Sequence, residues 1–199
     1  MRALLRAVAL FLALTGAALA GPFEDAVEAS NRGDYATALR LFRPLAEQGG
    51  VAAQYNLGIM YANGRGVPQD YGEAVRWWRR AAEQGLAGAQ HNLGFMYANG
   101  RGVPQNYDEA ARWYRRAAEQ GHAGAQNNLG AMYSTGDGVL QDYVLAHMWF
   151  NLAASRFAPS PDRDSAVTNR DRLAARMTPA QIAEAQRLAR EWDAAHPQR

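Results

Sequence analysis

The chain has 199 residues, of which 21 are arginine, 19 are acidic, and none is lysine or cysteine. This near balance of charge argues against a nucleic-acid-binding protein, which normally carries a strong basic excess. The lack of lysine excludes Schiff-base chemistry, a P-loop and a Ser-x-x-Lys nucleophile. Without disulfides, a chain of this length has to be stabilised by a packed core.

The first 20 residues have the layout of a secretory signal peptide. Arg2 and Arg6 precede an apolar run over 7–14, and small residues occupy the peptidase-read positions Ala18 and Ala20. The apolar run is too short for a membrane span, which needs roughly 20 residues. We expect cleavage after Ala20, no transmembrane segment in the mature chain, and a periplasmic or secreted protein.

Residues 21–51 predict a short helix pair. The segment DYATALRLFRPLAEQGG keeps the register of the copies that follow, since Tyr35 and Gly49 stand 36 positions before Tyr71 and Gly85. This N-terminal pair is similar to a plain tetratricopeptide unit.

A 36-residue repeat organises the next part of the chain. Residues 52–87 and 88–123 differ at only 8 of 36 positions without a gap, and 124–159 is a third, diverged copy. A regular period of this length is typical of stacked helical repeats.

Each copy predicts a first helix, a glycine-rich turn and a second helix. In the copy 52–87, the first helix covers about 53–62 and buries Leu57, Met60 and Tyr61, which recur at helical spacing. Glycines at 58, 94 and 130 weaken a helix interior, so we expect close helix contacts there. Gly64 ends the first helix.

The second helix of each copy begins after an acidic or amide cap. Asp70 and Glu73 resemble a capping box in the first copy. The aromatic residues at 77, 113 and 149, and those at 78, 114 and 150, predict core between helices. Arginines at 76, 79, 80, 112, 115 and 116 predict a solvated face, with Glu73 and Glu109 neutralising part of the charge.

The pattern AxxxLGxMYxxGxGVxQDYxxAxxWxxxAAxxGxAxAQ resembles the Sel1-like repeat family over roughly 34–159. The resemblance implies an all-α fold, a right-handed α/α superhelical solenoid of Sel1-like or tetratricopeptide-like helix pairs. It also implies a non-enzymatic protein that binds other proteins. Relatives with paired cysteines are stapled by disulfides, and this cysteine-free chain stands outside that subgroup.

Residues 160–199 predict a helical cap. In the third copy, Met148, Asn151 and Leu152 replace three arginines of the second, so an apolar face needs cover. We expect a linker over 158–161, a helix over 164–176, and a last helix capped by Thr178-Pro179. Terminal repeats of such arrays need a capping element.

No catalytic, metal or cofactor site is predicted. The four histidines, at 91, 122, 147 and 196, form no pair at helical ligand spacing, and no serine lies in a nucleophile motif. The recurring NGRGVPQ segments fit turns better than phosphate loops. The competing interpretation is a cell-wall-related protein that binds or hydrolyses β-lactam or peptidoglycan, for which Ser134 is the serine to test.

Positions that vary between copies predict where a partner binds. On the first helix of each copy, variable pairs four residues apart share one face, and in relatives this helix lines the concave side. The predicted strip consists of Tyr55, Ile59, His91, Phe95, Asn127 and Ala131. Its mixture of aromatic, apolar and polar groups is typical of binding surfaces. Drift at unconstrained positions is the competing interpretation. We expect a monomeric scaffold with an unidentified envelope or host protein as partner.

Overall fold

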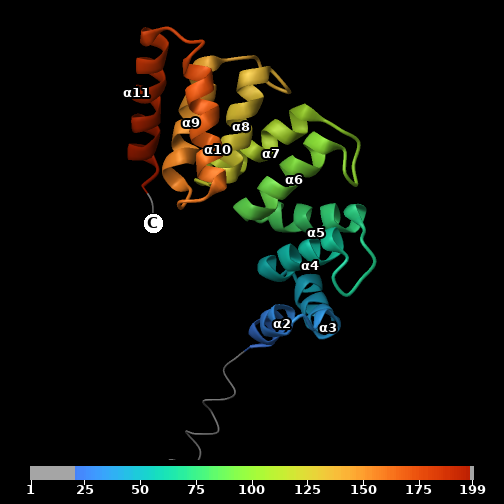
Figure 1. The fold of residues 1–199 in the computed structure, drawn as a ribbon. Coiled ribbons are helices and arrows are strands. Elements are labelled where there is room, and N and C mark those ends of the chain that lie inside the picture. Colours follow the sequence, from blue (N-terminus) through green and yellow to red (C-terminus); the bar gives the residue numbers. More distant parts are fainter. Residues whose placement is uncertain (1–20, 198–199) are drawn as a thin grey trace, which may run out of the picture. The chain divides into compact units, whose positions relative to one another are not determined.

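The computed structural model describes residues 21–197, and these residues form an all-α fold (Figure 1). The leader predicted over residues 1–20 lies outside them. The described chain divides into two compact units, which meet in sequence at Asp70 and Tyr71. Each unit is a series of helices in which neighbours in sequence pack together. The all-α solenoid class predicted from the repeats is therefore confirmed.

Over its described residues, 21–70, the first unit holds three helices. They are α2 (Pro22–Asn31), α3 (Tyr35–Glu47) and α4 (Val51–Asn63). Asp34 caps α3 by accepting a hydrogen bond from the backbone N–H of Thr37. The rings of Phe23 and Phe42 meet edge to face at 5.6 Å, which joins the N-terminal pair.

The second unit holds the remaining seven helices of the described chain. They are α5 (Tyr71–Glu83), α6 (Ala87–Asn99), α7 (Tyr107–Glu119), α8 (Ala123–Thr135), α9 (Tyr143–Arg156), α10 (Pro161–Ala174) and α11 (Pro179–Ala195). Helix α6 packs between α5 and α7, and α8 between α7 and α9. Both α10 and α11 pack on α9, as Figure 1 shows.

Buried glutamines link each first helix to the second helix of the preceding pair. The side-chain N–H of Gln90 donates to the carbonyl of Ala82, and Gln126 does the same to Ala118, both at 3.1 Å. In the first unit, Gln54 makes the same bond to Ala46. A buried amide left without a partner costs about 1–3 kcal/mol. The glutamine therefore favours one register between a second helix and the next first helix.

Two helix glycines allow the close contact that the sequence predicts. A Cβ on Gly94 would stand 2.6 Å from the Tyr114 ring, and one on Gly130 would stand 2.9 Å from the Phe150 ring. Each glycine lets an aromatic ring of the following helix lie directly against its backbone. The predicted aromatic core is confirmed at Tyr114 and Phe150, whereas Trp113 is only half-buried.

Second-helix caps and turns follow the predicted chemistry. The side chain of Asn106 accepts from the backbone N–H of Glu109, and Asp142 accepts from Leu145. Gly100 ends α6 in the left-handed conformation, with φ of 62°. The first helix of the copy 52–87 is longer than predicted, because α4 begins at Val51 and ends at Asn63.

The cap covers the third copy as expected, with different bounds. Leu152 and Met148 of α9 are buried in a cluster with Ala189 of α11, against which Leu188 and Trp192 also pack. The predicted linker and helix bounds were wrong, since α10 already begins at Pro161 and ends at Ala174. The reason is local: Ser160 provides the cap, and proline fits the first helical position.

Candidate functional site

The predicted strip is divided between the two units. Tyr55 and Ile59 lie on α4 in the first unit, and both are half-buried. They stand one helical turn apart, so their side chains share a face of α4. The other four residues lie on α6 and α8 in the second unit.

Phe95 is the most exposed member of the strip on α6. Its side chain is 40% exposed, which makes it one of three large apolar residues that the described chain leaves in solvent. The guanidinium of Arg101 lies 5.4 Å from its ring centre and 5.7 Å from that of Tyr71. Phe95 therefore presents an aromatic surface bordered by a positive charge.

His91 faces inward and takes part in a side-chain network. Its ring stacks on that of His122, with centres 4.6 Å apart, and lies 5.7 Å from the Tyr114 ring. The amide nitrogen of Asn128 lies 3.2 Å from His91 Nε2. His122 in turn caps α8, because its Nδ1 accepts from the backbone N–H of Ala125. No sequence pattern predicted this pair, because its members are 31 residues apart.

Burial sets the protonation of this network. It lowers the pKa of His91 to about 4, with the neighbouring His122 as a second cause. Burial also lowers the pKa of His122, and it raises the pKa of the Tyr114 phenol, which bonds to Asn128. All three groups are neutral near pH 7, so the network is a set of neutral hydrogen bonds and ring contacts.

The cap covers the α8 end of the predicted strip. The side-chain amide of Asn169 on α10 donates to Asn127 Oδ1 at 3.4 Å. Ala131 packs against the cluster of Ala146, Phe150 and Leu173. Asn127 and Ala131 thus contact the cap and the core beneath it, His91 has partners within the chain, and the open part of the strip in the second unit centres on Phe95.

The arginine face of the second helices is more ordered than a solvated face. The expected ion pairs of Arg76 with Glu73 and of Arg112 with Glu109 are present. Two further arginines instead reach the next copy: Arg79 donates to the Tyr97 hydroxyl at 2.5 Å, and Arg115 donates to that of Tyr133 at 3.0 Å. In each bond the arginine and the tyrosine are 18 residues apart, so the same link recurs between successive copies.

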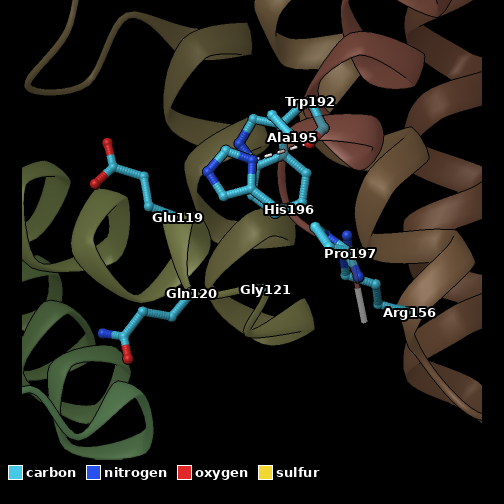
Figure 2. A pocket seen from close by; sticks show the side chains of 8 residues that line it. All are labelled: Glu119, Gln120, Gly121, Arg156, Trp192, Ala195, His196 and Pro197. Atoms are coloured by element: carbon cyan, nitrogen blue, oxygen red, sulfur yellow. Dashed lines mark hydrogen bonds between the residues drawn. The ribbon is translucent and has the colours of Figure 1, made fainter. Parts of the chain in front are cut away.

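A hollow of about 770 Å³ lies beside the turn between α7 and α8. Figure 2 shows Arg156, Trp192 and His196 on one side of it and Glu119 on the other. The His196 ring stacks on Trp192 at 4.1 Å, and the Arg156 guanidinium lies 4.8 Å from the same ring. Arg156 also pairs with Asp193 at 2.5 Å. The charged and aromatic groups of one wall are therefore engaged with one another.

Chemistry-bearing groups are sparse in the described residues. None of their histidine, aspartate and glutamate side chains gather in a group of three that could hold a metal ion. The Ser134 hydroxyl donates to the carbonyl of Ala131 at 2.8 Å. Over residues 21–197, no helix has both the length and the apolar character that crossing a membrane requires.

Comparison with known protein families finds a match to the repeats of this chain. The model of the Sel1 repeat matches residues 30–50, 51–86, 87–122 and 123–156, one residue earlier than the register used above. No curated protein matches the chain significantly.

Two solved structures are similar to the chain. A Sel1 repeat protein from Oxalobacter formigenes is 34% identical with a TM-score of 0.69, over 75% of this chain and 57% of that one. The protein c5321, a protective antigen of uropathogenic Escherichia coli strains with an SLR fold, is 31% identical with a TM-score of 0.59. That match covers 80% of this chain and 41% of c5321. The chain thus spans about half the length of these relatives.

The repeat matches cover more than half of the chain, and the glutamine bonds, helix glycines and capped second helices recur with the same period. Sel1 repeat proteins generally act as scaffolds for protein interactions and are typically not enzymes. The chain belongs to the Sel1 repeat family.

Proposed function

We propose that this protein is an exported scaffold that holds a protein partner against the exposed face of α6, a first helix of the repeat. The observation that carries the proposal is Phe95, a large aromatic side chain left 40% exposed on a helix whose other large apolar residues pack inward. Exposed aromatic groups beside polar ones are frequent anchors of protein interfaces.

Two further features support the same face. Arg101 beside Phe95 can pair with an acidic or carbonyl group of a partner while the ring contacts its apolar side chains. The corresponding face of α8 already accepts a helix, α10, through Asn127 and Ala131. A first-helix face of this fold is thus able to hold a helical segment.

The test is a pull-down from envelope extract with the full chain, purified as the cell processes it. Phe95→Ala should lose one specific protein that the wild type retains. Arg76→Ala, an exposed second-helix change, is the matched control and should retain it. Equal recovery of the partner by the wild type and both variants would mean that the partner binds elsewhere, and would refute the proposed binding face. A protein that instead sediments with purified sacculi would favour the cell-wall alternative, as would Ser134-dependent turnover of a chromogenic β-lactam.

Export is the second part of the proposal. The charged start, apolar run and small residues before Gly21 support it. Cell fractionation with mass spectrometry tests it: the product should begin at Gly21 and be recovered outside the cytoplasm. A cytoplasmic product that retains Met1 would refute export without affecting the binding face.

A further inference from the structure

Four tyrosines occupy one position of the repeat, at the first residue of a second helix: Tyr35, Tyr71, Tyr107 and Tyr143. Three of them carry an arginine over the ring. The guanidinium of Arg65 lies 5.5 Å from the ring centre of Tyr35, that of Arg101 lies 5.7 Å from Tyr71, and that of Arg176 lies 4.9 Å from Tyr143. Such a cation over an aromatic face is favourable by about 0.5–1 kcal/mol at exposed sites.

Tyr107 is the exception. Its loop carries Asp137 where the preceding loops carry arginine, and among the described residues no arginine lies over its ring. Its side chain is 41% exposed, whereas the other three tyrosines are half-buried. The backbone contact is nevertheless kept, since a Cβ on Gly138 would stand 2.3 Å from the Tyr107 carbonyl, as one on Gly102 would stand 2.4 Å from that of Tyr71. The aromatic ring is in place, and only its cation is missing.

The charge around this ring is also inverted. Asp108 follows Tyr107 where Gly72 follows Tyr71, and its backbone N–H lies against Gly138, the neighbour of Asp137. The one positive charge beside Tyr71, that of Arg101, is thus replaced by two negative charges beside Tyr107, those of Asp108 and Asp137. The Asp137 carboxylate is held by the Thr135 hydroxyl, which donates to it at 2.7 Å. This site now favours a cation supplied from outside the chain.

An apolar side chain stands in the same loop. Leu140 replaces the proline found at 68 and 104, and it is 91% exposed. A single exposed leucine is ordinary for a protein surface. Here, however, the same loop has also lost its arginine and gained the carboxylate of Asp137, and Asp108 adds a second carboxylate at the start of the neighbouring helix.

We propose that Tyr107, Asp108, Asp137 and Leu140, together the Tyr107 surface, bind a protein segment that presents an arginine next to an apolar side chain. The partner's guanidinium lies over the Tyr107 ring, as Arg101 lies over Tyr71, and pairs with the two carboxylates. Its apolar neighbour covers Leu140. This surface shares no residue with the Phe95 face, so either site can fail without the other.

The test measures binding of two labelled peptides to the full chain by fluorescence anisotropy. The first is Gly-Leu-Arg-Arg-Leu-Gly with blocked ends, and the second has glutamate in place of both arginines. The arginine peptide should bind at least about tenfold more tightly, because ring and carboxylates all favour the cation. Its affinity should fall with added salt, since the carboxylates are exposed.

Variants of the chain assign the site. Asp137→Arg/Leu140→Pro gives the third loop the residues that the second loop has at these two positions, so the variant should fold and lose at least about tenfold in affinity for the arginine peptide. Tyr107→Leu keeps an apolar side chain and removes the aromatic ring. It should weaken binding of the arginine peptide and leave binding of the glutamate peptide unchanged. Gly72→Asp/Arg101→Asp/Pro104→Leu gives the Tyr71 site the counterparts of Asp108, Asp137 and Leu140, and it should add a second peptide site.

Arg76→Ala, an exposed change outside both proposed surfaces, serves as the control, and it should leave peptide binding unchanged. Equal binding of the two peptides, or absence of binding by both, would overturn the proposal. Unaltered affinity in a folded Asp137→Arg/Leu140→Pro variant would overturn it as well. Neither result bears on the pull-down that tests the Phe95 face.

Discussion

The second and third copies place the same backbone in two different surroundings. Helix α7 of the second copy turns Arg112 and Arg116 to solvent, whereas α9 of the third copy buries Met148 and Leu152 under α11. The helices and capping bonds of the two copies correspond, so the difference lies in a few side chains. These side chains determine whether the outer face of a second helix is exposed to solvent or is covered by another helix.

The same contrast holds on the first helices. Helix α6 leaves Phe95 exposed and packs His91 against His122, whereas α8 has Ala131 and Asn127 at these positions and packs against α10. A small and a polar residue leave room for a helix, and an aromatic residue leaves an open surface. The repeat therefore supplies a frame, and its variable positions determine what each copy contacts.

The largest expected effect comes from exchanging residues on the second helices. Leu152→Arg places a charge under α11 at a position only 1% exposed, and we expect a loss of about 4 kcal/mol in the free energy of unfolding. The matched change Arg116→Leu, at the same repeat position on exposed α7, should cost less than about 1 kcal/mol. Urea denaturation measures both. Similar losses in the two variants would contradict the contrast between α7 and α9.

The histidine network of the second copy predicts an acid-sensitive contribution to stability. Burial, with His122 as a second cause, holds the pKa of His91 at about 4 in the folded chain, against about 6.5 when unfolded. The unfolded state then binds more protons, so stability is complete above about pH 6.5 and falls as pH drops toward 4. We expect a loss on the order of 2 kcal/mol across this window, measured by urea denaturation at each pH.

His91→Asn tests the origin of that loss, since asparagine is the residue that the third copy holds at this position. The variant should show a flatter pH profile between pH 6.5 and 4. An unchanged slope in His91→Asn would show that other groups cause the acid sensitivity.

Alanine at the two helix glycines should give a smaller effect. The Cβ of Gly94→Ala would lie 2.6 Å from the Tyr114 ring, and that of Gly130→Ala would lie 2.9 Å from the Phe150 ring. Both rings therefore have to move. We expect losses of about 1–3 kcal/mol, larger for Gly94, because Tyr114 is also held by Asn128. Thermal and urea unfolding check the order. A gain in stability from either change, as ordinary helix propensity predicts, would refute the close contact.

The smallest effect concerns the links between copies. Tyr97→Phe and Tyr133→Phe each remove the hydroxyl that accepts a bond from Arg79 or Arg115. We expect about 0.5–1 kcal/mol for each, with the larger value for Tyr133, whose bond is partly buried. Urea denaturation of the two single variants and of their combination measures the costs, which should add. A loss well above 1 kcal/mol would mean that these links also order the copies.

Much of the fold follows from the sequence, because its causes act within one helix pair. The 36-residue period, the caps at Asn106 and Asp142 and the glycine at 94 are local signals, and each appears in the structure as predicted. The apolar change at Leu152 likewise predicted a cover, since an apolar face has to leave water. Helix bounds were less accurate at Pro161, where a cap and a proline outweighed the assumed linker.

Only the tertiary structure decided which variable residues are open. His91 and Asn127 occupy one repeat position, yet His91 stacks on His122 of a distant turn and Asn127 bonds to Asn169 of the cap. Tyr107 looks like its counterparts in the sequence, and its uncovered ring emerges only once Arg101 and Arg176 are seen over the others. The physical reason is that the period fixes the backbone, whereas side-chain contacts depend on elements that come together only when the chain folds.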